Sequence, residues 1–395
     1  MDRGAGSVDG TGATDRCASM SKPMFSLRRP AILNPEGYLD LISGRRRGWI
    51  ATVQRSLLQL GTVPYATVIA GRNWLFDRHL TRSHAVSVPV ISVGNITVGG
   101  TGKTPLVYWL AQWLAQQDLR VTLISRGYGS NAHEPNDEAL ELGQRLPGVP
   151  HLLNPNRVQA ARRAVEELKS QVIVLDDGFQ HRRIARDLDL VLVDATNPFG
   201  YGHLLPRGTL REPIAALRRA DMIALTRVNL VPEDTLEELE SQLATYAPQV
   251  PRFRVAYQPQ KLLNASQQEM ALGDLVGRSV AAFCGVGNPQ AFRQTLEGCQ
   301  FEVVDFRAFP DHHPFGPEDI DSLTHWLGHL DGIDSVVCTH KDLVKISLVQ
   351  LAEIPLWALI VQPEITTGQP ALEERLKKLI RQDREQEEEE PGGEL

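Results

Sequence analysis

A glycine-rich stretch that ends in Gly-Lys-Thr has the residue types needed to bind a phosphate chain. Gly99, Gly100 and Gly102 carry no Cβ, so the backbone N–H groups around them can approach phosphate oxygens closely. Lys103 would pair with the β- and γ-phosphate oxygens, and the Thr104 hydroxyl would hold Mg²⁺. The stretch therefore predicts a loop that binds a nucleotide polyphosphate.

The residues on either side of this loop predict a strand before it and a helix after it. Residues 90–93 are apolar or small, and apolar residues recur at helical spacing over 106–114. Strand, glycine loop and helix in this order form a P-loop. Thr97 departs from the usual pattern, which has glycine five residues before Gly102. The doubled glycine resembles the loop of the dimerising P-loop ATPases, although Val98 replaces their signature lysine; a plain glycine-rich turn is the alternative.

A pair of aspartates follows a second apolar run. Residues 172–175 read VIVL, and Asp176 and Asp177 come directly after them. In P-loop enzymes a carboxylate at such a strand end holds Mg²⁺ beside the phosphates. Two aspartates could equally lie in a surface turn. Because a P-loop lies upstream, we expect Asp176 and Asp177 to form a magnesium site with Thr104.

Two arginines lie in glycine-containing loops that follow predicted strands. Arg126 opens the sequence RGYG after residues 120–125, and Arg211 lies in the long loop 197–213. Loops at the carboxyl ends of strands lie on the ligand side of an open α/β sheet. Since guanidinium groups suit phosphate recognition, Arg126 and Arg211 are candidates for holding substrate or nucleotide phosphates.

Asp137 and the histidines near residue 312 have more than one interpretation. Asp137 precedes a helical stretch, where an acidic residue has a capping role. Asp311-His312-His313 could be a metal site, but no His-x-x-x-His pair or cysteine partner stands at ligand spacing. The alternatives are a hydrogen-bonded or solvent-facing histidine, and support of catalysis. The widely spaced cysteines indicate a reducing compartment and no zinc site.

Predicted strands and helices alternate from residue 88 onward. Crossover helices between apolar strands imply a mainly parallel sheet that is covered on both faces. The sequence therefore predicts an α/β fold with a P-loop NTPase-type core over residues 85–246. A smaller C-terminal α/β subdomain is expected over 247–380. Helices are expected over 157–169 and 289–296, and later strands over 253–257, 280–284, 301–306 and 335–339.

The two ends of the chain differ in composition from the middle. Residues 1–44 are rich in Gly, Ser, Asp and Arg and predict a disordered extension. Residues 383–394 carry seven acidic residues and one arginine, so an acidic disordered tail is expected over 381–395. This tail accounts for most of the net charge of −7.

Residues 45–84 combine basic and aromatic flanks with an apolar middle. The uncharged stretch 56–71 is too short to be assigned as a membrane span and contains polar residues and a proline. Such a pattern suits a helix that lies in a membrane interface. A helical hairpin packed on the catalytic core is the alternative.

Seven sequence blocks, covering roughly residues 45–365, resemble the tetraacyldisaccharide 4'-kinase family. The resemblance implies transfer of the γ-phosphate of ATP to the 4'-hydroxyl of an acylated glucosamine disaccharide 1-phosphate, giving lipid IVA in lipid A biosynthesis. It also implies peripheral attachment at the cytoplasmic face of the inner membrane. The blocks are VGNITVGGTGKTP, SRGYG, DDGFQHRR, LLPRGTLREP, FCGVGNPQAF, FPDHHPF and THKDLVK.

The resemblance also assigns roles to individual residues. Asp137 matches the aspartate of the family's Gly-Asp-Glu-Pro motif and would be the catalytic base, partnered by His312. This chain departs there, because it reads Asn-Asp-Glu-Ala over 136–139. Lys103 and Asp177 would also be catalytic, with Asp176 and Asp177 as the acidic pair. The ATP-binding loop would comprise Thr97, Val98, Gly99, Gly100, Thr101, Gly102, Lys103 and Thr104.

Partners follow from the same resemblance. Family members carry a basic, apolar N-terminal helical segment that seats them on the bilayer, so residues 45–84 are expected to associate with the membrane surface. ATP and Mg²⁺ are the expected cofactors. We expect a monomer and no nucleic-acid partner. The alternative function is a P-loop ATPase switch or chaperone of the dimerising class, which would hydrolyse ATP without lipid.

Overall fold

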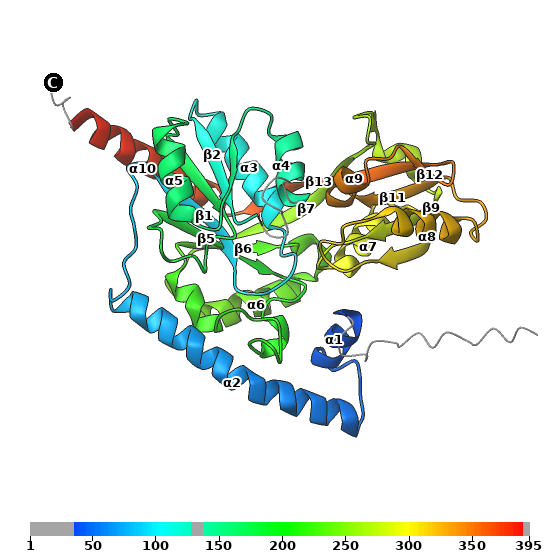
Figure 1. Cartoon of the computed structure of the whole chain (residues 1–395), viewed down its shortest axis with the longest axis horizontal. Coiled ribbons are helices and arrows are strands. Elements are labelled where there is room, and N and C mark those ends of the chain that lie inside the picture. The colour runs from blue at the N-terminus through cyan, green and yellow to red at the C-terminus, as the bar shows by residue number, and fades with distance from the viewer. Residues whose placement is uncertain (1–34, 128–136, 390–395) are drawn as a thin grey trace, which may run out of the picture.

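The computed structural model describes residues 35–127 and 137–389, in which one twisted sheet runs through the whole molecule. Its strands lie in the order β10-β9-β11-β13-β7-β6-β5-β1-β4-β2-β3, and β8 and β12 pair at its margins. Figure 1 shows helices on both sides of this sheet and a second, smaller lobe beyond β7 and β13. Nearly all neighbouring strands are parallel, so the predicted α/β class with a P-loop-type core is confirmed.

The larger lobe is built from parallel strands that are buried on both faces. Side chains alternate across the sheet: Ile91 and Val93 face α3, whereas Val90 and Ile173 face α5. This double burial explains why the strands read as continuous apolar runs. The strands are β1 (Val90–Asn95), β2 (Val121–Ser125), β3 (His151–Leu153), β4 (Val172–Asp176), β5 (Leu188–Asp194) and β6 (Met222–Thr226). The helices are α3 (Lys103–Ala115), α4 (Asp137–Arg145), α5 (Arg157–Glu166) and α6 (Glu233–Tyr246).

The smaller lobe repeats the same strand and helix alternation. Phe283 and Val336 lie fully buried in its core, packed against Trp326. Its strands are β9 (Ser279–Cys284), β10 (Glu302–Ala308) and β11 (Ser335–Thr339), and its helices are α7 (Pro289–Gly298), α8 (Pro317–Leu327) and α9 (His340–Ile346). Four short helices complete the connections of the whole sheet. Three precede α6, namely η1 (Gly200–Gly202), η2 (Ile214–Arg219) and η3 (Val228–Leu230), and η4 (Leu272–Leu275) precedes β9.

Two long antiparallel strands join the lobes. β7 spans Arg252–Leu263, well beyond the expected strand over 253–257, and β13 spans Ile354–Thr367. The first part of β7 pairs with β6 of the larger lobe, and the first part of β13 pairs with β11 of the smaller lobe. Both lobes thus share one backbone hydrogen-bond network. Short strands β8 (Glu269–Met270) and β12 (Gln350–Leu351) pair with β7 and β13, respectively.

The N-terminal segment forms two helices below the larger lobe. Residues 1–44 were expected to be disordered, but α1 covers Pro35–Ile42, and Leu41 and Ile42 are buried. α2 covers Trp49–Asp77 and lies along the lobe as one long helix (Figure 1). Only Ala51, Thr62 and Phe76 of α2 are buried. None of the helices in the described ranges is long and apolar enough to cross a bilayer.

The C-terminal helix corrects the expectation of a disordered tail from residue 381. α10 covers Gln369–Glu389 and therefore extends into the acidic stretch. Its first turns dock on the larger lobe through Leu372 and Leu376, which are fully buried. Docking of this apolar stripe, together with a sequence rich in good helix formers, stabilises a helix that charge composition alone argued against.

Candidate active site

A cavity of about 530 Å³ lies between the two lobes at the carboxyl ends of β1, β2 and β4. The larger lobe contributes the P-loop, Arg126, Asp176 and Asp177 to its wall. The smaller lobe contributes Asp311, His312 and Lys341. The structure therefore brings most of the predicted site residues together around one cavity, although they come from segments far apart in the sequence.

The P-loop carbonyls over residues 100–102 are held in place by three side chains. The Arg227 guanidinium donates to the first carbonyl at 2.6 Å, the Thr226 hydroxyl to the second at 2.9 Å, and the Tyr257 hydroxyl to the third at 2.6 Å. With the carbonyls fixed on that side, the loop's N–H groups are left to turn toward a bound phosphate chain. The sequence carries no motif that marks these three residues, because they come from β6, the residue after it, and β7, all distant from the P-loop in sequence.

Two glycines of the site are required by close packing as well as by phosphate access. Gly102 has a φ of +84°, and a Cβ there would lie 2.3 Å from the Tyr257 ring. Gly287, from the loop between β9 and α7, packs against the P-loop so closely that a Cβ would lie 2.3 Å from the Gly100 nitrogen. The smaller lobe therefore touches the P-loop backbone directly.

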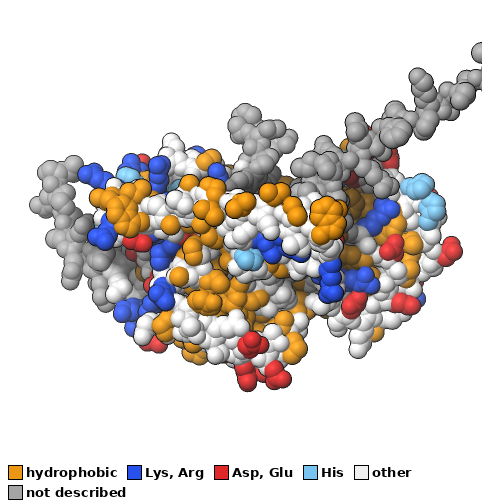
Figure 2. Space-filling view, turned by 90° about the horizontal axis from the view of Figure 1, so that it is seen from below, with side chains coloured by type: hydrophobic (Ala, Val, Ile, Leu, Met, Phe, Trp, Pro, Cys, Tyr) orange, Lys and Arg blue, Asp and Glu red, His pale blue; other side chains and the backbone are white. Residues whose placement is uncertain are grey.

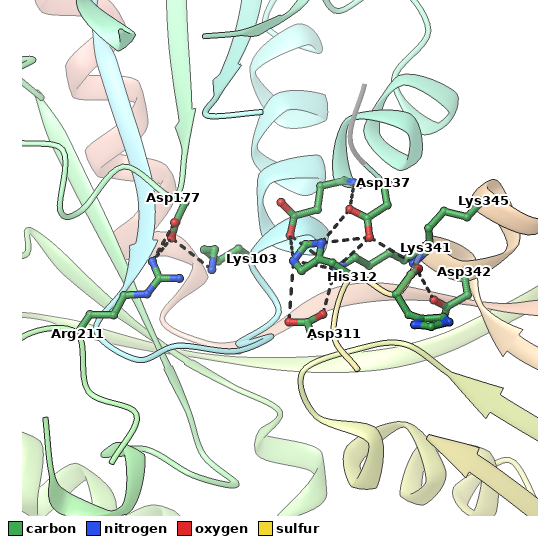
Figure 3. Close-up of polar contacts among 11 residues, drawn as sticks. Lys103, Asp137, Asp177, Arg211, Asp311, His312, Lys341, Asp342 and Lys345 are labelled. Carbon is green, nitrogen blue, oxygen red and sulfur yellow. Dashed lines mark hydrogen bonds and ion pairs between the residues drawn. The ribbon is translucent and has the colours of Figure 1, made fainter. Parts of the chain in front are cut away.

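Asp177 lies at the centre of a charged cluster on the phosphate side of the cavity (Figure 3). Arg211 Nη1 contacts both carboxylate oxygens of Asp177, at 2.9 and 2.8 Å, and Lys103 Nζ lies 3.4 Å from Oδ1. Burial alone would raise the pKa of Asp177, but the two cations outweigh it and lower the pKa to about 2. Arg211 thus pairs with an acidic site residue, and Arg126 lines the cavity wall.

Asp176 differs from its neighbour because it is more deeply buried and the charges of Lys103 and Arg157 only partly offset the effect of that burial. Its Oδ1 has no hydrogen-bond partner among the described residues. Burial, reinforced by the nearby carboxylates of Glu138 and Asp177, raises the pKa of Asp176 above its ordinary value. A buried, unpartnered carboxylate oxygen beside the P-loop fits the expected Mg²⁺, since Mg²⁺ is held by one or two carboxylates together with substrate phosphates.

Asp137 and His312 meet across the lobes on the opposite side of the cavity. Asp137 begins α4, and His312 Nδ1 lies 2.9 Å from its Oδ1 (Figure 3). The hydrogen bond that protonated His312 donates to the Asp137 carboxylate raises the pKa of His312. Burial opposes ionisation of Asp137, but His312 and two lysines outweigh it and hold the pKa of this carboxyl well below its usual range. The structure thus places the expected base and its partner in contact.

The two lysines around Asp137 were not predicted as site residues. Lys341 Nζ lies 3.5 Å and Lys345 Nζ 3.4 Å from Asp137 Oδ2, and both come from α9. They belong to the sequence THKDLVK, one of the blocks that carried the family resemblance without a role. Within the described parts of the chain, no group of three or more His, Cys, Asp and Glu side chains is placed to hold a metal.

The strand order, the loop after β1 and the acidic end of β4 define the class: this is a P-loop nucleotide-binding α/β protein. A family model described as tetraacyldisaccharide-1-P 4'-kinase matches residues 54–381. The tetraacyldisaccharide 4'-kinase of Anaeromyxobacter dehalogenans (strain 2CP-C) is 39% identical over 358 residues, which cover 86% of this chain and 94% of that protein. The tetraacyldisaccharide 4'-kinase of Halothermothrix orenii is 37% identical over 341 residues, which cover 79% of this chain and 88% of that protein. The chain belongs to the tetraacyldisaccharide 4'-kinase family.

A solved structure agrees with this membership. The crystal structure of the "apo" form of LpxK from Aquifex aeolicus in complex with ATP is 32% identical to this chain, with a TM-score of 0.64. The match covers 84% of this chain and 99% of that one. The predicted family, and with it an ATP-using kinase class, is therefore confirmed.

Proposed function

We propose that this protein transfers the γ-phosphate of ATP to the 4'-hydroxyl of a tetraacylated glucosamine disaccharide 1-phosphate, forming lipid IVA. The observation that carries the proposal is the Asp137–His312 pair: His312 lines the same cavity as Lys103 and the P-loop, and Asp137 lies directly behind it, 2.9 Å from its Nδ1. A P-loop ATPase needs only the phosphate side of that cavity. A carboxylate base on the opposite side is what a kinase needs for a hydroxyl acceptor.

The residues then divide the transfer between them. The P-loop N–H groups and Lys103 bind the phosphate chain and neutralise charge that builds up during transfer. Asp137, oriented by His312, accepts the proton of the 4'-hydroxyl. The hydroxyl oxygen forms a bond to the γ-phosphorus while the bond from that phosphorus to the β,γ-bridging oxygen breaks, and ADP leaves. Arg211 positions Asp177, and Arg126 contributes positive charge to the substrate side of the cavity.

Mg²⁺ would be held by Thr104, Asp176 and Asp177. Of the two aspartates, Asp176 has the unpartnered, buried oxygen, whereas Asp177 is already bound by Lys103 and Arg211. The contacts therefore favour Asp176 as the direct ligand. When bound, the ion neutralises charge on the phosphate oxygens.

The lipid substrate is proposed to reach the site along α2. Exposed apolar side chains follow this helix, and Figure 2 shows that face with hydrophobic side chains in orange and Lys and Arg in blue. Such a face, flanked by arginines, suits a helix lying in the interface of an anionic bilayer. The exposed apolar residues of α2 are Trp49, Ile50, Val53, Leu57, Leu60, Val63, Val68, Trp74 and Leu75.

Hydrogen bonds connect this helix to the cavity. The Tyr65 hydroxyl donates to the Arg211 carbonyl at 2.8 Å, and Asn73 Nδ2 donates to Glu212 at 2.8 Å. A membrane-bound α2 would thus hold the loop around Arg211 close to the bilayer. The family resemblance supports the further proposal that the protein is a monomer attached peripherally to the cytoplasmic face of the inner membrane.

The transfer assay tests the main proposal. Wild type and Asp137→Asn are given γ-labelled ATP, Mg²⁺ and tetraacyldisaccharide 1-phosphate in detergent micelles. Labelled lipid with wild type and a loss of at least about 100-fold with Asp137→Asn are expected, since general bases contribute about 10²–10⁴ in rate. Steady ATP hydrolysis without labelled lipid would instead support the ATPase switch.

Vesicle flotation tests the membrane proposal. Wild type is expected to float with phosphatidylglycerol vesicles, and the pair Leu57→Asp and Leu60→Asp to stay in the dense fraction. Val304→Asp is the matched control, because Val304 is an exposed apolar residue on β10, an edge strand of the smaller lobe. Equal flotation of all the proteins would contradict a role for α2. Sedimentation analysis in detergent tests whether the protein is a monomer.

A further inference from the structure

Lys341 lies among three carboxylates at the point where the two lobes meet. It occupies the first turn of α9, directly after β11. Its Nζ lies 3.3 Å from Asp311 Oδ1, 3.5 Å from Asp137 Oδ2 and 3.9 Å from Glu138 Oε1. Asp137 and Glu138 belong to the larger lobe and Asp311 to the smaller one. Figure 3 shows Lys341 reaching toward His312 from this side of the cavity.

The side chain of Lys341 faces the space in which a phosphate chain would bind. It lines the same cavity as Lys103, Arg126 and the P-loop. Among the described residues, its Nζ contacts the three carboxylates and the His312 Nε2 atom, 3.4 Å away. These contacts are long charged or polar contacts of 3.3 to 3.9 Å, so a bound anion can compete for the ammonium group.

Lys345, one turn later on the same helix, is held in a different way. Its Nζ donates to the His313 carbonyl at 2.8 Å and lies 3.2 Å from Asp342, whose side chain is fully buried. It also lies over the Phe315 ring. Unlike Lys341, Lys345 is not part of the cavity wall. Its Nζ also lies 3.4 Å from Asp137 Oδ2, so Lys345 is expected to fix α9 and to orient Asp137 without touching a bound phosphate chain.

We propose that Lys341 is a second phosphate-contacting lysine, which leaves Asp137 and binds the γ-phosphoryl group of ATP during transfer. Three carboxylates close to the incoming phosphate chain would repel it unless a cation stood between them. Lys341 supplies that cation from the smaller lobe, opposite Lys103 from the larger lobe. The inference rests on the proposed function, because it assigns the charge to the group being transferred.

The exchange also affects the base. An ammonium group beside Asp137 stabilises its ionised form and weakens it as a proton acceptor. When Lys341 turns to the γ-phosphoryl group, Asp137 loses one positive neighbour and becomes more basic at the moment when the acceptor hydroxyl is present. Lys341 therefore neutralises the phosphoryl charge and activates the base in one movement.

The test compares ATP-like and ADP binding in matched variants. Lys341→Met removes the charge at nearly constant length, Lys341→Arg retains it, and Lys345→Met is the control on the same helix. Affinity for Mg²⁺ with β,γ-methylene ATP and with ADP is measured by titration, and kcat by the lipid assay. Lys341→Met is expected to weaken the binding of β,γ-methylene ATP and to leave ADP binding unchanged. It is also expected to lower kcat by about 10²–10³-fold, the range for losing one charge-stabilising donor.

The controls separate a phosphate contact from a structural role. Lys341→Arg is expected to restore much of the preference for the methylene ATP, whereas Lys345→Met should lower the thermal midpoint and leave that preference unchanged. If Lys341→Met binds both nucleotides in the wild-type ratio, the proposed contact is wrong, whatever happens to kcat. Lys341→Gln carries the same comparison if the methionine variant does not fold.

The binding result is independent of the lipid reaction. If wild type labels no lipid but Lys341→Met still loses its preference for the methylene ATP, the lysine contact stands and the proposed function fails. If wild type labels lipid and Lys341→Met matches it within about threefold in kcat, less than the loss expected for one donor, the lysine has no catalytic role.

Discussion

The two sides of the cavity are built in different ways. The phosphate side comes from strand ends of one parallel sheet, where the loop after β1 and the end of β4 lie next to each other by register. The acceptor side is assembled from α4 of the larger lobe and from the loop and helix of the smaller lobe. The proposed phosphate site therefore depends on local sequence, whereas the geometry of the proposed base, Asp137, depends on how the lobes meet.

The forces that hold each side also differ. The P-loop carbonyls over 100–102 accept hydrogen bonds from side chains of β6, of the residue after β6, and of β7. Asp137 is held by His312, Lys341 and Lys345 through charged contacts across a cavity. Hydrogen bonds from a packed sheet give a preformed site, while charged contacts can be exchanged. We infer that the P-loop backbone is preformed and that the acceptor side adjusts to substrate.

The largest effect is expected on the phosphate side. Lys103→Met removes the charge that pairs with the β- and γ-phosphates, so transfer should fall by at least about 10³-fold, the upper range for one charged donor. ATP binding should weaken as well, and the lipid assay together with nucleotide titration checks both. Retention of more than a tenth of wild-type transfer would show that the P-loop lysine is dispensable.

A change on the acceptor side should leave nucleotide binding intact. Asp137→Asn keeps the size of the side chain but removes the proton acceptor, so kcat should fall while the ATP dissociation constant stays within about threefold, well under the tenfold that 1.4 kcal/mol would produce. Titration with β,γ-methylene ATP measures the nucleotide dissociation constant, and the lipid assay measures kcat. Equal loss of binding and kcat would mean that the two sides are not separable.

The direct contact between the lobes offers a third test. Gly287→Ala would place a Cβ 2.3 Å from the Gly100 nitrogen, so the smaller lobe must shift away from the P-loop. We expect a fall in kcat of about tenfold, because misplacing a catalytic group by about 1 Å costs up to 10²-fold. Gly298→Ala is the control, since nothing lies within 4 Å of a Cβ there. Equal kcat in both variants would show that the contact between the lobes does not position His312 against Asp137.

The smallest effect concerns the pH dependence of stability. The raised pKa of His312 means that the folded protein holds this proton more tightly than the unfolded chain. The contribution of the Asp137–His312 pair is therefore complete below the ordinary histidine pKa of about 6.5 and is lost as pH rises through the folded value. Because His312 is half-exposed, solvent screening keeps the contribution small.

Denaturant unfolding of wild type and His312→Asn at several pH values measures this contribution. The stability difference between the two proteins should be largest near about pH 5.5 and should shrink toward about pH 9, on either side of the histidine pKa. His329→Asn is a control. His329 is exposed on the smaller lobe, and its ring contacts the His325 carbonyl and no acidic side chain of the described residues. A difference that grows with pH would contradict the assignment of His312 as the protonated partner.

Prediction of the fold from sequence was accurate where periodicity was strong. The strands that became β1, β4, β9 and β11 were expected within a residue or two, because buried parallel strands read as apolar runs. β13 was not expected, and β7 was expected at less than half its length. These strands mix short buried runs with exposed positions and owe their length to pairing with each other, which periodicity within either segment does not reveal.

By itself the sequence determined the phosphate side of this protein, because glycines, lysine and strand-end aspartates act through local backbone geometry. Recognition of family motifs named Asp137 and His312, but their contact across 175 residues came only from the tertiary structure. The same holds for Tyr257, which lies outside the family blocks, and for Lys341 and Lys345, whose block carries the resemblance but assigns neither lysine a role. Their roles arise from which surfaces the two lobes bring together, and that is decided by packing along β7 and β13.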